Sequence, residues 1–130
     1  MEVSEVERPH TVLLVEDDRE LRSLFALLME LQGLSVIQAE RGDEAVETLR
    51  EQADRIGVVV ADFGVPVLSG QELLRSIRAA RPAIRLLCTS GRGDEQTRQD
   101  ALAAGADDFV PKPFQPPEMI ARIKACLESA

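Results

Sequence analysis

The sequence predicts an α/β fold in which a five-stranded parallel sheet of order 2-1-3-4-5 is covered by five helices, a doubly wound, flavodoxin-like arrangement. Three observations lead to it. Short apolar runs alternate with segments of helical periodicity along nearly the whole chain. The run at residues 56–61 is apolar throughout, which is typical of a central strand buried on both faces. The length of 130 residues suits one domain of ordinary size.

Each predicted strand is followed by a predicted helix. The apolar stripe of the first helix ends at Gly33, a residue type that commonly follows a helix. The second helix is expected at residues 43–52, and the third closes before Pro82. We expect Asp94 to cap the fourth helix and Pro116 to begin the fifth. In chain order, the predicted strands are residues 11–16, 35–39, 56–61, 85–89 and 108–110.

The composition narrows the class of protein. Lys plus Arg number 15 and Asp plus Glu number 23, so the formal net charge is −8, which argues against nucleic acid or an anionic membrane as a direct partner. Cys88 and Cys126 do not have a metal-binding or redox spacing, and we interpret both as buried thiols in a reducing cytoplasm. Residues 1–9 lack the apolar stretch of a signal peptide or membrane span. We expect a flexible arm there and one domain over residues 10–130.

Polar residues follow four of the apolar runs: Glu16-Asp17, Asp62, Ser90 and Lys112. Because parallel strands end at the same edge of a sheet, these side chains should meet in one crevice. Three neighbouring carboxylates repel one another, so the cluster makes sense around a hard divalent cation such as Mg²⁺. Asp62 would then act as a nucleophile toward a phosphoryl group, with Lys112 and Ser90 on its oxygens.

Each of these residues has an ordinary reading when taken alone. Asp17 would be a helix cap, Asp62 a loop acid, Ser90 a turn residue and Lys112 a solvated lysine. Their placement after successive strands of one sheet favours the joint functional interpretation over these separate ones.

After residue 10, nearly the whole chain resembles the response-regulator receiver domains of two-component signalling, in particular the chemotaxis-regulator type. No single motif is specific, but their combination is. The motifs are Leu14-Val15-Glu16-Asp17-Asp18, Asp62 four residues before Pro66, Gly70, Ser90-Gly91, Gly105-Ala106-Asp107-Asp108-Phe109 and Lys112-Pro113-Phe114.

The resemblance implies a role for each matching residue. By resemblance Glu16 and Asp17 form the acidic pair, Asp62 is the phosphoacceptor, Ser90 the switch hydroxyl, Phe109 the switch aromatic, Lys112 the invariant lysine, Lys112–Pro113 a cis peptide bond, and Gly64 a metal ligand through its backbone carbonyl. The implied ion is Mg²⁺, with Mn²⁺ as an alternative.

Two of these assignments required a choice. The acidic pair is Glu16-Asp17 because the family's pair directly follows the apolar run, which leaves Asp18 to cap the first helix. The switch hydroxyl is Ser90 because a small residue, Gly91, follows it; Thr89 should then point into the core.

Two positions near the predicted site leave questions open. Gly64 departs from the family's pattern by lacking a side chain, which changes the access of water to a phosphoryl group. Arg92 either contacts phosphate or is solvated.

The resemblance implies a phosphorylation-dependent signalling switch. Its phosphoryl donor would be a histidine kinase or a histidine phosphotransfer protein, and its fourth and fifth helices would present the altered face to an output partner. It would be no enzyme beyond its own aspartyl phosphorylation and dephosphorylation, and would be a cytoplasmic monomer or a weak homodimer through that face. The sequence suits a stand-alone regulator as well as part of a larger regulator or hybrid kinase.

Two other functions compete with this one. One is a receiver-like interaction module that is never phosphorylated, which the intact set of acids, serine and lysine disfavours. The other is an aspartate-nucleophile phosphatase of haloacid-dehalogenase type. Such an enzyme usually carries Asp-x-Asp on its first strand, where this chain has Glu16-Asp17-Asp18.

Overall fold

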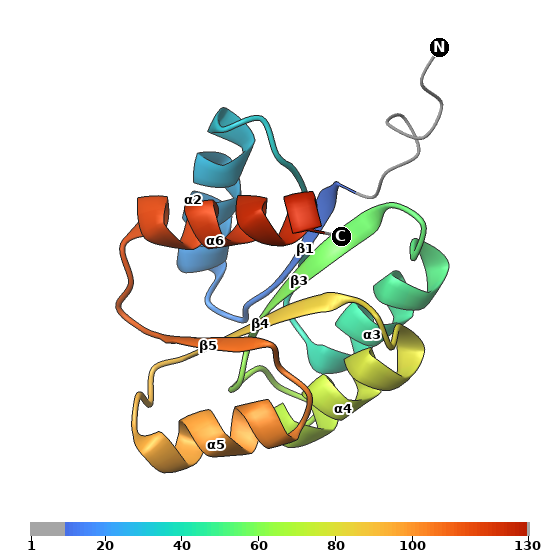
Figure 1. Ribbon diagram of the computed structural model, residues 1–130, viewed down its shortest axis with the longest axis vertical. Helices are drawn as coiled ribbons and strands as arrows, with labels where there is room; N and C mark the ends of the chain where they lie inside the picture. The colour runs from blue at the N-terminus through green and yellow to red at the C-terminus, as the bar shows by residue number, and fades with distance from the viewer. Residues whose placement is uncertain (1–9, 130) are drawn as a thin grey trace.

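The computed structural model describes residues 10–129, so the expected arm at residues 1–9 lies outside the described part of the chain. Five parallel strands form one sheet in the order β2-β1-β3-β4-β5, as predicted (Figure 1). The strands are β1 (Thr11–Val15), β2 (Ser35–Ala39), β3 (Ile56–Asp62), β4 (Arg85–Ser90) and β5 (Asp108–Pro111). The helices are α2 (Arg19–Leu31), α3 (Gly42–Glu51), α4 (Gly70–Ala80), α5 (Glu95–Ala103) and α6 (Pro116–Ser129).

Helices cover both faces of the sheet, which separates two layers of core (Figure 1). Along β3, Val58 and Val60 pack with residues of α2 and α6, whereas Val59 and Ala61 pack with residues of α3, α4 and α5. Successive side chains of a strand point to opposite faces, so a strand buried on both must be apolar throughout. All seven residues of β3 are buried, and the strand extends one residue further than predicted, to Asp62.

Three helices, α2, α5 and α6, begin where the sequence signals placed them, and α3 begins one residue earlier, at Gly42. Asp18 accepts a hydrogen bond from the Leu21 amide at 3.1 Å, and Asp94 accepts one from the Thr97 amide at 2.7 Å. Both acids therefore cap their helices, as predicted. Ser69 and Glu72 form a reciprocal capping box at the start of α4, which satisfies two backbone amides there.

One expectation about the cysteines was wrong. Cys88 is completely buried in β4, and burial, followed by the charge of Asp62, raises the pKa of its thiol to about 12. Cys126 is only half-buried, because it packs at the margin of the core layer between α6 and the sheet. None of the helices in the described chain is both long and apolar enough to cross a membrane.

Candidate functional site

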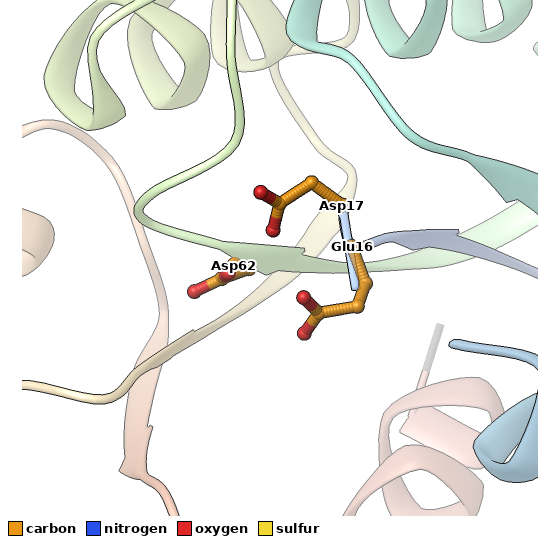
Figure 2. Close-up of side chains that lie close together, drawn as sticks. All are labelled: Glu16, Asp17 and Asp62. Atoms are coloured by element: carbon orange, nitrogen blue, oxygen red, sulfur yellow. The ribbon is translucent and has the colours of Figure 1, made fainter. Parts of the chain in front are cut away.

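Three carboxylates gather at the carboxyl edge of the sheet (Figure 2). Glu16 and Asp17 directly follow β1, and Asp62 is the last residue of β3, the neighbouring strand. Each contributes an oxygen that lies within 4.8 Å of the other two. Glu16 is only 4% exposed and Asp62 8% exposed, whereas Asp17 is open to solvent. The structure therefore brings together the three acids that the sequence analysis grouped.

Lys112 supplies a positive charge to this cluster. Its Nζ lies 2.6 Å from Glu16 Oε1 and 3.4 Å from Asp62 Oδ2. Burial raises the pKa of Glu16, and the hydrogen bonds from Lys112 and the Asp18 amide offset this only in part. Burial alone would lower the pKa of Lys112, but its bond to Glu16 and the charges of Asp62 and Glu16 outweigh burial and raise it. The lysine is thus held as an ammonium ion between two carboxylates.

The acids and the lysine line an open cleft of about 580 Å³. Ser90 ends β4 in this cleft, where its Oγ accepts a hydrogen bond from the Arg92 amide at 3.0 Å. Gly64 lies at the mouth, and a Cβ added there would meet no atom within 4 Å. The side chain of Arg92 is 81% exposed, with its guanidinium 3.6 Å from Asp94. In this structure Arg92 therefore faces solvent and pairs with the helix cap.

The structure separates Thr89 from Ser90, as the sequence analysis expected. Thr89 is buried and lines a small cavity on the side of α2, together with Phe25 and Phe114. Ser90 lines the cleft. Phe109 on β5 is 8% exposed and packs in the core layer of α3, α4 and α5.

The segment after β5 carries Lys112 into the site. The backbone amide of Lys112 donates to the Ser90 carbonyl at 2.8 Å, which ties this segment to the end of β4. The peptide bond between Lys112 and Pro113 is cis, the isomer that the resemblance implied.

Arg22 also belongs to this site, although the sequence analysis did not single it out. Its side chain is 12% exposed, and Nη1 donates to the backbone carbonyl of Glu16 at 2.8 Å. In the sequence Arg22 is a charged residue between apolar positions of an amphipathic helix, which is usually a solvated position. Nothing in the spacing indicated that it would turn back onto the preceding strand end.

The donor set fits a hard divalent cation. Carboxylate oxygens are the ligands that Mg²⁺ prefers, and Mg²⁺ commonly binds through a few carboxylates while it keeps several waters. Here two carboxylates are buried and preorganised, and the third, Asp17, opens toward solvent. Without a cation, one ammonium group faces three carboxylates. The excess negative charge is what a divalent ion would neutralise.

Residues 12–124 match the family model of the response regulator receiver domain. The chain belongs to this family. As a receiver domain of two-component response regulators it is a signal-transduction domain, and its fold and site agree with that membership.

The chain is similar to curated response regulators and to solved receiver-domain structures. The chain is 40% identical over 116 residues to the transcriptional regulatory protein CpxR of Escherichia coli (strain K12). The aligned region makes up 89% of this chain and 48% of CpxR. The receiver domain of the Francisella response regulator 1452 has a TM-score of 0.85 at 25% identity and covers 92% of this chain and 98% of that one. A chain of the CheX–CheY–BeF3–Mg²⁺ complex from Borrelia burgdorferi has a TM-score of 0.84 at 26% identity, covering 93% and 91%. The receiver domain spans about half the length of the curated relatives it matches.

Proposed function

We propose that this receiver domain accepts a phosphoryl group on Asp62 from a phosphohistidine of a kinase or phosphotransfer protein, and that the aspartyl phosphate switches its surface. One observation carries the proposal: Asp62 ends the central strand with its carboxylate between two further acids and the Lys112 ammonium, at the base of an open cleft. A carboxylate in such a cleft can be reached by a donor from outside.

The chemistry follows from the neighbours of Asp62. An oxygen of Asp62 attacks phosphorus while the bond from phosphorus to the donor nitrogen breaks, and the electron pair of that bond returns to the imidazole. Mg²⁺, held by Glu16, Asp17, Asp62 and the backbone carbonyl of Gly64, would neutralise charge on the carboxylates and on the phosphoryl oxygens. BeF3 and Mg²⁺ in the Borrelia burgdorferi complex support this type of site; Mn²⁺ would serve in the same way.

Lys112 and Ser90 would stabilise the product. Phosphorylation adds a charge of roughly −1.5 to −2 next to Asp62. Lys112 Nζ already lies 3.4 Å from Asp62 Oδ2. It can donate to a phosphoryl oxygen when a cation replaces it as the partner of the Glu16 carboxylate. Ser90 Oγ is held by the Arg92 amide and can turn its own proton toward the same oxygen.

The switch would propagate along β4 and β5. Ser90 ends β4, and its carbonyl accepts a hydrogen bond from the Lys112 amide. A movement of the end of β4 would therefore also move the segment that follows β5. Phe109 lies on β5 three residues before Lys112, in register with Cys88 of β4. We propose that Phe109 turns when Ser90 moves, which alters the face formed by α5, β5 and α6 for an output partner.

The experiment is intact-mass measurement after incubation with acetyl phosphate or phosphoramidate, with and without Mg²⁺. We expect a single phosphate adduct that needs Mg²⁺ and is lost in Asp62→Asn. Asp54→Asn, at an exposed turn away from the cleft, is the matched control and should be labelled like wild type. Persistent labelling of Asp62→Asn would refute the assignment. A folded protein that binds Mg²⁺ but gives no adduct would favour a module that works without phosphorylation.

A further inference from the structure

Arg22 connects three parts of the molecule through one guanidinium group. Nη1 donates to the backbone carbonyl of Glu16 at 2.8 Å, and Nε donates to Gln38 Oε1 at 3.2 Å. Nη2 lies 4.0 Å from Glu40 Oε2. Side chains of a helix lean toward its N-terminus, so this residue in the first turn of α2 reaches back to the end of β1 and across to β2.

The contact to Glu16 completes a set of interactions that hold this residue. The Glu16 amide donates to the Ala39 carbonyl at 3.0 Å. Its side chain accepts from the Asp18 amide at 3.1 Å and from Lys112 Nζ at 2.6 Å. The Glu16 carbonyl accepts from Arg22. The amide, the carboxylate and the carbonyl of Glu16 therefore each have a partner, and the carbonyl depends on Arg22.

The contact between Arg22 and the Glu16 carbonyl matters for Asp17, the next residue in the chain. For the described residues 10–129, the structure records no hydrogen bond or ion pair to the Asp17 side chain, which is exposed beside the cleft. The backbone therefore sets the point and direction from which this carboxylate projects, with no side-chain partner to correct them. The Glu16 carbonyl belongs to the rigid peptide plane that joins Glu16 to Asp17, so fixing this carbonyl fixes the direction in which Asp17 leaves the strand.

We propose that Arg22 is a positioning residue that holds the Glu16–Asp17 peptide so that the two carboxylates converge with Asp62 on a divalent cation. The inference rests on the proposed function, since it concerns the same cation site. An arginine suits this role because its planar fork can donate to Glu16 and Gln38 at once, whereas a lysine carries a single donor atom.

A merely structural role would make Arg22 a tie between α2 and β2. The two roles can be separated, because Gln38 and Glu16 are contacted by different nitrogen atoms. Gln38→Ala removes the hydrogen bond from Arg22 to β2 and leaves the contact with the Glu16 carbonyl. Arg22→Met removes both hydrogen bonds and the ion pair with Glu40, and keeps most of the aliphatic side chain.

The test is Mg²⁺ affinity by isothermal titration calorimetry, since the chain has neither Trp nor Tyr to report binding by fluorescence. We expect Arg22→Met to bind Mg²⁺ about tenfold more weakly than wild type, the loss typical of one charge-assisted hydrogen bond. Gln38→Ala should stay within about twofold of wild type. The Asp17 amide resonance should shift in Arg22→Met without Mg²⁺ and should stay in place in Gln38→Ala.

Several outcomes would overturn the inference. Wild-type affinity in folded Arg22→Met would do so, as would equal weakening by Gln38→Ala, which would leave only the tie between α2 and β2. Arg22→Gln is a second variant should Arg22→Met fail to fold, and the same results would count against the inference. The proposed function fails separately: wild type would then bind no Mg²⁺, or Asp17→Asn would bind it unchanged.

Discussion

At the scale of single residues, the site carries more negative than positive charge: three carboxylates lie around the Lys112 ammonium. Lys112 pairs with two carboxylates of the cleft, those of Glu16 and Asp62. A divalent cation that binds Glu16 would compete with Lys112 for its carboxylate. Metal binding and release of the lysine toward Asp62 are therefore expected to be coupled.

Lys112→Ala separates metal binding from switching. We expect this variant to bind Mg²⁺ at least as tightly as wild type, because the ammonium no longer competes for Glu16. With Mg²⁺ and BeF3 added, the amide resonances of Ser90 and Phe109 should move in wild type and remain nearly unchanged in the variant. Lys124→Ala on α6 is the matched control. Wild-type shifts in Lys112→Ala would contradict the role of the lysine.

At the scale of elements, the loop between β3 and α4 contains a strained residue. Val67 has a φ of 85°, a conformation that a β-branched side chain rarely adopts, and its side chain is 63% exposed. Val67→Asn should raise the free energy of unfolding by about 1 kcal/mol, because asparagine tolerates this region better. Urea denaturation measures the change. Val67→Ala, which keeps a Cβ without branching, should gain less, and a loss of stability in Val67→Asn would argue against strain.

Helix α2 presents apolar side chains to solvent. Leu24, Leu27 and Leu31 are 54%, 51% and 70% exposed. Leu24 also lines an apolar cavity of about 390 Å³ with Lys112, Pro113 and Phe114, the segment that enters the site. A protein that brings a phosphohistidine to Asp62 would bury part of this surface.

Leu24→Asp should therefore distinguish two kinds of donor. Phosphoryl transfer from a phosphorylated protein donor should slow by roughly tenfold or more, because a charge would enter an apolar contact. Labelling by acetyl phosphate, which needs no such contact, should be unchanged. Ala79→Asp on the exposed side of α4 is the control. Equal transfer rates from the protein donor to both variants would show that this face of α2 is not used.

At the scale of the whole molecule, the features that could be predicted from the sequence are those that follow from apolar periodicity and strand order. Asp62 and Glu16 could be placed together because parallel strands must end at one edge, and right-handed crossovers make β1 and β3 neighbours. Element ends shift by one residue, since apolar pattern does not mark where the last ladder hydrogen bond lies.

Contacts that depend on the reach of a long side chain could not be predicted. Arg78 on α4 donates to the backbone carbonyls of Gly105, Pro82 and Ile84 and pairs with Asp107, which fastens the far end of the sheet. Arg22 does the same for the site. In the sequence, both have the pattern of solvated helix positions, and only the packed geometry shows their partners. The positive φ of Val67 could not be predicted from the sequence either, because valine is not a residue type that favours this conformation.

Cation binding should be visible in the stability of the entire domain. The three converging carboxylates exist only in the folded chain, so Mg²⁺ that binds them stabilises the folded state. At a concentration 100 times its dissociation constant, Mg²⁺ should raise the free energy of unfolding by about 2.7 kcal/mol. The unfolding midpoint would rise on the order of 10 °C for a domain of this size.

General screening must be distinguished from binding, because a net charge of −8 makes the fold sensitive to any salt. Calorimetric melting in MgCl2 should therefore be compared with NaCl at equal ionic strength, in wild type and in Asp17→Asn. Site binding predicts that the extra stabilisation by MgCl2 largely disappears in Asp17→Asn, whose exposed side chain makes little contribution to packing. If both salts stabilise both proteins equally, the three carboxylates do not form a cation site. The coupling between metal binding, Lys112 and Asp62 would then also be refuted.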